Sequence, residues 1–318
     1  MIHWPSCLSK TARVISLLTS AFFLSIQVNV TSALETRDLK HLFDLTHAEQ
    51  VALSLPTDVA IAPDGRIYVV DGSNHRIAVF DKAGRFLNVI GAKGSADGQF
   101  LSPIGITVDK KGNVYIADSG NYRIQIFNDS GGFIRKIKLR EKNRKIKPID
   151  VAINQSKKIL YITGNNNHKV MRYSTRGKFL GSWGKKGNNP REFRYPATIT
   201  VSDEGLVYVV DVLNSRIQIF ESNGKLSTTA GSWGVLPGQL FRPKGVALGR
   251  KDQIYVSDSY MDLIEVYDNK TKFSHVLGKD NKPHKFVTPA GITIDKHNRI
   301  YVTEMLNNKV SVYQLLKD

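Results

Sequence analysis

The amino-acid sequence predicts an all-β fold, a six-bladed β-propeller whose blades are four-stranded antiparallel sheets. The main observation is a ten-residue stretch, DGSNHRIAVF in its first copy, that recurs six times at intervals of 46 or 47 residues. A short tyrosine-containing apolar run precedes every copy, and it has neither the spacing nor the length of a helix. Sheets this small cannot bury both faces alone, and packing six of them around an axis solves that problem. The copies begin at Asp71, Asp118, Gly164, Asp211, Asp258 and Glu304.

Each repeat opens with an apolar run introduced by a proline, which we expect to be its first strand. The tyrosine-containing run is the second strand, and the loop between the two carries turn residues, as in PDGR after Ala62. The recurring stretch supplies the next turn and the third strand, and another glycine turn leads into the fourth. The prolines are Pro56, Pro103, Pro148, Pro196, Pro243 and Pro289, in repeats near 53–91, 100–139, 145–184, 193–234, 240–278 and 286–316.

The last repeat ends before a fourth strand, which would leave an unpaired edge on the final blade. The segment LKHLFDL at 39–45 precedes the first repeat at a suitable distance to replace that strand. We therefore expect one ring over residues 34–318, closed by pairing of this N-terminal strand with the last blade.

Residues 1–33 have the pattern of a signal peptide. Lys10 and Arg13 precede the apolar run at 14–30, and small residues follow up to a cleavage position after Ala33. This predicts an exported protein, periplasmic or extracellular; the alternative is an uncleaved N-terminal membrane anchor. Cys7, the only cysteine, precedes the apolar run, so the mature chain would have neither a disulfide nor a cysteine-ligated metal.

The recurring stretch resembles the NHL repeat. Its pattern is Asp, two residues, Asn, any residue, Arg or Lys, then Ile or Val, with the upstream proline and a downstream GSWG at 181–184 and 231–234. The resemblance covers almost all of the mature chain. It implies a six-bladed propeller used mainly as a binding platform, sometimes for RNA. A related propeller is the peptidyl-hydroxyglycine amidating lyase.

The polar residues of this pattern are interpreted as scaffold rather than catalytic machinery. We expect the Asp and Asn to hydrogen-bond turn backbone and the Arg to pair with carboxylates between blades. The fifth residue of the stretch varies freely, as expected of a turn surface. It is His75, Tyr122, His168, Ser215, Asp262 or Asn308.

No catalytic residues are predicted. A zinc lyase needs converging histidines, and none falls in a first strand, where the corresponding positions hold Asp58, Gly105, Asp150, Thr198, Gly245 and Gly291. The histidines of the mature chain are His41, His47, His75, His168, His275, His284 and His297. Asp58 and Asp150 start the first strands of alternate blades and face the central tunnel in this fold. They are candidate calcium ligands, or else acceptors for neighbouring backbone N–H groups; no other cofactor is expected.

The formal net charge is +17, and much of the excess lies in the crossings, the segments that join one repeat to the next. The second crossing, 139–147, holds five basic residues against one acidic, and the third, 184–195, holds four against one. In a meander all crossings emerge on one face of the ring. The candidate binding residues are Arg140, Lys142, Arg144, Lys145, Lys147, Lys185, Lys186, Arg191 and Arg194.

These observations predict an exported, non-enzymatic and monomeric propeller that binds an anionic macromolecule through its crossings. Acidic proteins, anionic glycans and lipid head groups are candidate partners. Export argues against cellular RNA and leaves extracellular DNA. Two alternatives remain open at this stage: the basic loops serve only to solvate this face, or the chain is a metal-dependent hydrolase or lyase with its site at the central tunnel.

Overall fold

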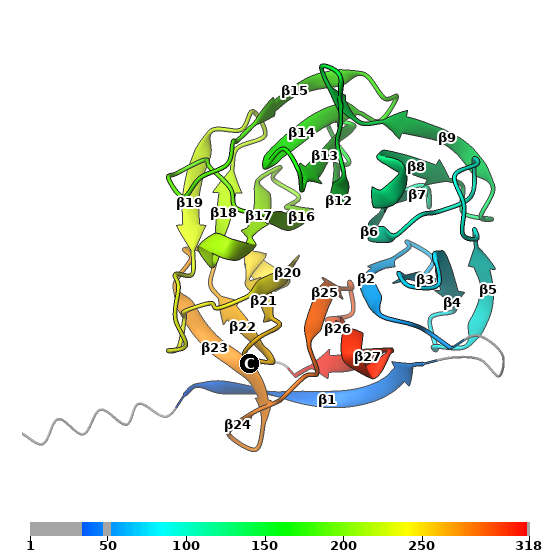
Figure 1. Cartoon of the computed structure of the whole chain (residues 1–318). Helices are drawn as coiled ribbons and strands as arrows, with labels where there is room; N and C mark the ends of the chain where they lie inside the picture. Colours follow the sequence, from blue (N-terminus) through cyan, green and yellow to red (C-terminus); the bar gives the residue numbers. More distant parts are fainter. Residues whose placement is uncertain (1–33, 47–51, 317–318) are drawn as a thin grey trace, which may run out of the picture. The chain divides into compact units, whose positions relative to one another are not determined.

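Six four-stranded antiparallel sheets stand around a central axis in the computed structural model, which describes residues 34–46 and 52–316 (Figure 1). The predicted signal peptide and His47 lie outside these residues. The described part of the chain is all-β, with four single turns of 3-10 helix and no α-helix. None of its helices is long and apolar enough to cross a membrane.

The six blades follow one another along the chain, and each predicted proline begins the innermost strand. The first three blades are β2 (Pro56–Ile61), β3 (Ile67–Asp71), β4 (Arg76–Phe80) and β5 (Phe86–Ile90); β6 (Pro103–Val108), β7 (Val114–Asp118), β8 (Arg123–Phe127) and β9 (Phe133–Lys138); β12 (Pro148–Asn154), β13 (Ile159–Gly164), β14 (Lys169–Ser174) and β15 (Phe179–Trp183). The last three are β16 (Pro196–Val201), β17 (Val207–Asp211), β18 (Arg216–Phe220) and β19 (Leu226–Ala230); β20 (Pro243–Leu248), β21 (Ile254–Asp258), β22 (Leu263–Tyr267) and β23 (Phe273–Lys279); β25 (Pro289–Ile294), β26 (Arg299–Glu304) and β27 (Lys309–Leu315), completed by β1 (Thr36–Leu45).

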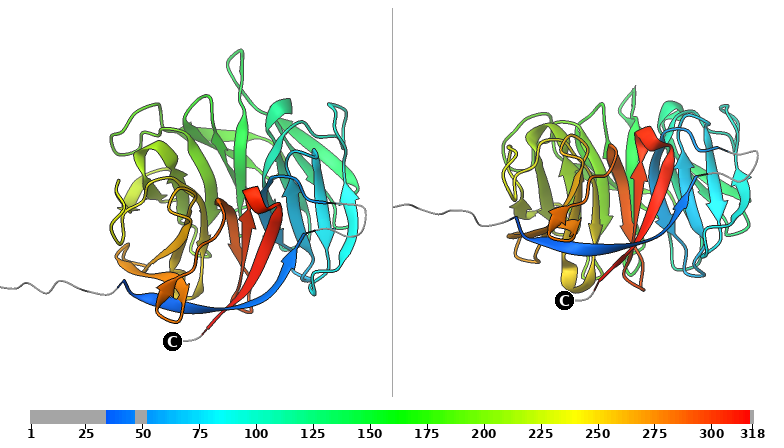
Figure 2. Two further views of the ribbon diagram at one scale, coloured as in Figure 1. Left: turned by 60° about the horizontal axis from the view of Figure 1, so that its bottom comes forward. Right: turned by 90° about the horizontal axis from the view of Figure 1, so that it is seen from below.

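The N-terminal strand closes the ring, as expected, but it is longer than the predicted 39–45. From Leu39 to Leu45 it pairs antiparallel with β27 as the missing outer strand of blade 6. Its first three residues pair parallel with β23 of blade 5, with Thr36 opposite Val276. This strand therefore joins two blades into one continuous sheet along the outside of the ring (Figure 2).

The core lies between neighbouring blades. The tyrosines of the second strands are all buried, and hydroxyl groups of two of them reach turns of the next blade: Tyr68 donates to the carbonyl of Asp129, and Tyr161 to that of Ser222. Their rings fill the space between the sheets. The repeated tyrosine thus specifies contact between blades as well as strand formation.

The two GSWG sequences are not structurally equivalent, contrary to the sequence interpretation. Trp183 is 5% exposed and packs between blades 3 and 4 against Tyr161 and Phe220. Trp233 is 71% exposed in the next crossing, where it pairs with Leu240 as Lys186 pairs with Phe193. The second GSWG is shifted by three residues relative to the repeat, so one tryptophan falls in the core and the other on the surface.

Blade 5 departs from the repeat at two positions of β22. Leu263 replaces the arginine of blades 1, 2 and 4, and Glu265 replaces the glutamine of blades 2 and 4. Glu265 is 2% exposed, and Tyr267 Oη donates to its carboxylate at 2.7 Å. Burial raises the pKa of Glu265 from its ordinary 4.5 to about 8, and the charge of Asp258 adds to this effect.

Glu265→Gln should stabilise the protein above neutral pH. A folded-state pKa raised above the unfolded value means that the wild type loses stability as pH rises from about 4 to about 8, and the amide removes that loss. We expect the free energy of unfolding to increase by roughly 2 to 4 kcal/mol at pH 8 and much less at pH 4. Urea denaturation at both pH values measures this difference. Glu204→Gln, at an exposed turn, is the matched control, and an equal gain at both pH values would contradict the assignment.

Candidate functional site

The crossings and the turns between second and third strands emerge at the same end of the ring, which we call the crossover face (Figure 2). The nine predicted basic residues all lie on its loops, and all are exposed. We call these nine residues the basic arc. They occupy two neighbouring crossings, into blade 3 and into blade 4, so the structure brings together the residues that the sequence singled out.

The second crossing folds into a β-hairpin that stands out from the crossover face (Figure 2). Its strands are β10 (Arg140–Glu141) and β11 (Arg144–Lys145), joined by a two-residue turn in which Lys142 has a φ of 53°. Leu139 and Ile146 flank the hairpin and are completely buried, so they anchor its base. The anchored hairpin thereby presents four of the nine basic side chains to solvent.

The single acidic residue of this crossing is neutralised within its own blade. Lys169 of β14 forms a hydrogen-bonded ion pair with Glu141, and this contact lowers the pKa of Glu141. Lys145 Nζ lies 5.4 Å from the ring centroid of Tyr122, in cation–π range. Both residues line a pocket of about 280 Å³ together with Lys138 and Arg140, which gives the basic arc a concave, cationic part.

The third crossing keeps most of its charge free. Lys185 Nζ lies 3.1 Å from a carboxylate oxygen of Glu192. Within 34–46 and 52–316 none of the other eight residues of the basic arc has an ion-pair partner. Burial lowers the pKa of the neighbouring His168, and the charges of Lys186 and Arg144 lower it further. The lowered pKa of His168 thus reflects in part the positive electrostatic potential around the basic arc.

The repeated Asp, Asn and Arg hold these loops in place. In blade 4, Asp211 is completely buried at the end of β17 and accepts the backbone N–H of Arg194 at 2.7 Å. Its other oxygen accepts Arg216 Nε at 2.9 Å and Asn214 Nδ2 at 2.8 Å. Arg216 also donates to the carbonyls of Asn189 and Glu192. Blades 1 and 2 build the same cluster, which we call the loop clamp, on Asp71 and Asp118.

The main partner of the arginine differs from the expectation. It is the aspartate of its own repeat in blades 1, 2 and 4, and only Arg123 among them also contacts a carboxylate of the crossing between blades, that of Asp97 at 3.4 Å. The reason is register: in blade 4, Asp211 and Arg216 are directly opposite each other on β17 and β18. The variable residue of the turn, which has a left-handed backbone, makes a further contact between blades. His75 Nδ1 accepts the N–H of Ser102, and Asn308 Oδ1 accepts that of Leu55, each just before the proline of the next blade.

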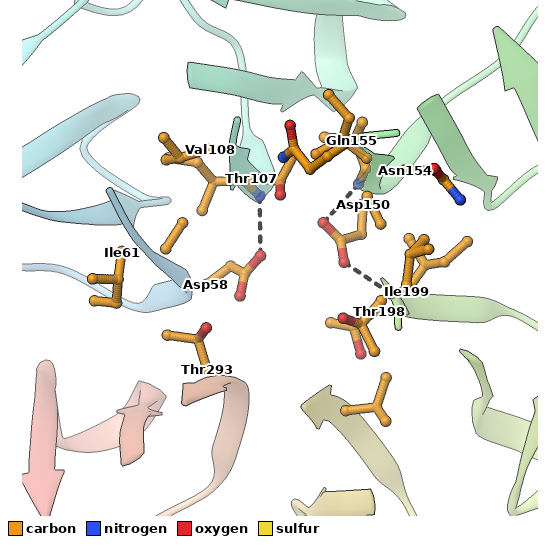
Figure 3. Close-up of a pocket in the computed structure, with 18 of the residues that line it drawn as sticks. Asp58, Ile61, Thr107, Val108, Asp150, Asn154, Gln155, Thr198, Ile199 and Thr293 are labelled. Atoms are coloured by element: carbon orange, nitrogen blue, oxygen red, sulfur yellow. Dashed lines mark hydrogen bonds between the residues drawn. The ribbon is translucent and has the colours of Figure 1, made fainter. Parts of the chain in front are cut away.

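Asp58 and Asp150 both face the tunnel, from blades 1 and 3 (Figure 3). One oxygen of Asp58 accepts the N–H of Val59 at 2.9 Å, and the other accepts that of Ile106 in blade 2 at 3.0 Å. Asp150 makes the same two bonds, to the next residue and to blade 4. A side chain at Gly291, in blade 6, would collide with the Asp58 carboxylate. Each aspartate therefore fastens consecutive blades around the tunnel.

Burial raises the pKa of both tunnel carboxyls, to about 7 for Asp150 and well above the ordinary value for Asp58, where the charge of Asp150 adds to the effect. They line a cavity of about 300 Å³ whose wall also carries Thr107, Thr198 and Thr293. Among the residues that the structure describes, no three or more His, Cys, Asp or Glu side chains converge as a metal site.

Two features of the molecule escaped sequence reasoning. The opposite end of the ring is also basic, because Lys110, Lys111, Lys157, Lys158 and Arg176 surround a pocket of about 610 Å³ there. The charge excess is therefore not confined to the crossover face. The tunnel mouth on the crossover face is an apolar funnel of about 580 Å³, lined by residues such as Ile104, Ile149 and Leu213, with Lys244 among them. The funnel could not be predicted from the charge of each loop, because its lining is mostly apolar.

Comparison with known proteins supports the fold. Residues 43–141 match the model of a family described as a 6-bladed β-propeller, and residues 193–220 match the NHL repeat. The chain resembles a streptogramin B lyase at 16% identity (TM-score 0.64, covering 87% of this chain and 98% of that one). It also resembles a gluconolactonase from Xanthomonas campestris at 14% identity (TM-score 0.65, 87% and 89%). At such identities the likeness shows the fold alone. No curated protein matches the chain.

Removing the loop clamp of blade 4 should loosen the third crossing. Asp211→Ala leaves Arg216 without its carboxylate, and loss of one partner of a buried ion pair costs roughly 3 to 5 kcal/mol of unfolding free energy. Urea denaturation measures the loss, and hydrogen exchange should accelerate at the amides of 187–194. Asp203→Ala, at an exposed turn, is the control. Unchanged exchange in the third crossing would refute the role of the clamp.

Proposed function

Because the chain is an NHL-repeat β-propeller, we propose that it serves as a binding platform for an anionic macromolecule or surface and that the basic arc makes the contact. The observation that carries the proposal is that eight of the nine exposed basic residues have no carboxylate partner in the described part of the chain. A carboxylate partner cancels most of the charge of an exposed cation, so that a paired cation attracts an anionic ligand only weakly. Here the pairing partners are few and the loops are fixed, so the charge is available.

The arrangement of the basic arc favours a large ligand over a single small anion. Its residues spread over a protruding hairpin and the adjacent crossing, and charges within roughly one Debye length of about 8 Å act together at physiological salt. Such a cluster raises the encounter rate with a polyanion and makes binding sensitive to ionic strength. The cationic pocket beside Tyr122 is a place where one anionic group of that polymer or surface would be held.

The N-terminal sequence supports a role outside the cytoplasm, because the run at 14–30 and the small residues before 34 fit an export signal. An exported platform would meet acidic proteins, anionic glycans and lipid head groups. Nucleic acid would be available as extracellular DNA only. The partner we propose is thus an anionic component of the cell envelope or its surroundings.

Charge reversal tests the basic arc. Arg140→Glu, Arg144→Glu and Lys145→Glu together should lower the salt concentration at which the protein elutes from immobilised heparin, used as a polyanion probe. The control reverses Lys110, Lys111 and Lys158 at the opposite end, which changes the net charge equally. We expect a clearly smaller shift for the control. Equal shifts for the two variants would mean that no face is preferred and would overturn the proposal.

A second candidate is a metal-dependent hydrolase or lyase that works in the tunnel. It is favoured by the two carboxylates that face one cavity and by the fold shared with a lyase and a lactonase. Against it, every oxygen of Asp58 and Asp150 already accepts a backbone N–H, and calcium usually takes six or more oxygen ligands.

Calcium addition separates the two functions. Under the binding proposal, excess calcium should leave the Tm unchanged, because a ligand raises the Tm only by binding the folded state. Differential scanning calorimetry of the wild type with calcium or with chelator measures this. The same scans on Asp150→Asn provide the comparison. A calcium-dependent rise that the Asp150→Asn variant lacks would favour the tunnel enzyme.

A further inference from the structure

The crossover face exposes large apolar side chains as well as cations. They belong to separate loops around the ring rather than to one groove. Examples from four of these loops are Tyr195, Trp233, Leu236, Tyr260 and Leu306, all more than a third exposed. A single exposed apolar residue is ordinary on a soluble protein, whereas a cluster of them marks a place that meets a partner or a membrane.

The most exposed group lies in the fourth crossing, and we call Trp233, Val235 and Leu236 the apolar tip. Trp233 is 71% exposed, and Val235 and Leu236 are each 64% exposed. The tip cannot fold back onto the core because its backbone is fixed. Gln239 Oε1 accepts the N–H of Leu236 at 3.1 Å, and Trp233 is held in a bridge to Leu240.

The corresponding position in the first and third crossings is a lysine. Lys93 bridges to Phe100 and Lys186 to Phe193, in the same geometry as Trp233 and Leu240. The fourth crossing has therefore exchanged a cation for the largest apolar side chain without changing the loop. The backbone frame does not require tryptophan here, so its presence points to a contact outside the molecule.

An aromatic pair continues the tip toward blade 5. The rings of Phe241 and Tyr260 are stacked with centroids 4.1 Å apart, and Trp233 lies 6.2 Å from Phe241. Tyr260 is exposed, and Arg242 beside it is an exposed cation. Tryptophan and tyrosine flanked by basic residues are the side chains that favour the interface between lipid head groups and acyl chains.

Carboxylates in the first three crossings are neutralised by the protein itself, whereas Asp262 and Asp280, near blades 5 and 6, have no ion-pair partner within 34–46 and 52–316. Lys136 Nζ lies 2.5 Å from Asp97, Lys169 pairs with Glu141, and Lys185 pairs with Glu192. An anionic bilayer would therefore meet little repulsion from acidic residues at these three crossings. The basic arc lies in the two crossings that precede the apolar tip along the ring, so both groups can reach one surface.

We propose that the crossover face docks on an anionic lipid bilayer, with the apolar tip inserted among the head groups and the basic arc against the lipid phosphates. The inference rests on the proposed function for the basic arc and names its ligand. A protein interface would have an apolar core depleted of charge. Here exposed apolar side chains and cations occupy separate loops of one face. A lipid bilayer can contact all of these loops at once, because its surface is continuous and deformable.

Tryptophan fluorescence gives a direct test, because Trp183 is 5% exposed and Trp233 is the exposed tryptophan of the described chain. The protein is purified from the exported fraction, and its N-terminus is determined by mass spectrometry. Vesicles of phosphatidylcholine with phosphatidylglycerol should shift the emission to the blue, whereas vesicles of phosphatidylcholine alone should not. Trp233→Phe should abolish the shift and leave the buried signal intact.

Co-sedimentation with the same anionic vesicles measures affinity. Val235→Ser with Leu236→Ser should weaken binding about tenfold or more, because apolar area inserted into the interface contributes to membrane binding. The matched control is Leu87→Ser with Val89→Ser, two exposed apolar residues of the outer strand β5. Heparin elution should be unchanged in both variants, which confirms that they fold and retain the basic arc.

The outcomes distinguish the two proposals. A protein that binds heparin through the basic arc but neither sediments with anionic vesicles nor shifts its emission overturns the lipid inference alone. Vesicle binding that the Val235/Leu236 variant retains in full also overturns it. Salt-sensitive binding to polyglutamate without vesicle binding would assign the face to an acidic protein. Failure to bind heparin, polyglutamate and vesicles overturns both the inference and the proposed function.

Discussion

The buried carboxylate at the end of the second strand is the interaction on which the crossover face depends. Asp211 accepts hydrogen bonds from a strand arginine, a turn asparagine and the backbone of the incoming crossing, and Asp71 and Asp118 repeat this arrangement. Removal of a charge from water is expensive unless it is fully paired, and this cluster pairs it. The crossing is therefore tied to the blade by its main chain, and its side chains are left free to vary. The crossover face therefore combines a constant frame with variable loops, as the proposed binding role requires.

The same logic explains why crossings of very different chemistry coexist in one ring. The first, third and fourth crossings share a bridged backbone although one side chain at the bridge is tryptophan and two are lysine. The second crossing abandons that frame for a hairpin anchored by Leu139 and Ile146. Around the tunnel, Asp58 and Asp150 tie the blades together, which allows the loops to specialise without weakening the ring.

Repetition made the fold predictable, and single positions limited the prediction of the site. The six blades could be predicted from the spacing of the copies and from the proline that opens each of them. The closure of the ring could be predicted because the last repeat lacks a fourth strand. The pairing of Arg216 with its own repeat depends on which residues lie opposite each other, which the pattern alone does not specify. Trp183 and Trp233 share a local sequence and differ in burial because one copy is out of phase. The apolar tip could not be predicted, because the residue types of a sequence give the charge of a loop but not the solvent exposure of its side chains.

The strand that joins blades 5 and 6 makes completion of the ring a late event. Leu39 lies opposite Leu315, so all of the residues between them must be synthesised before that ladder can form. Contacts between residues so distant in sequence form slowly, since a very large loop has to be closed first. Until then the outer edge of β27 lacks its partner. β1 therefore has to remain available until β27 is complete.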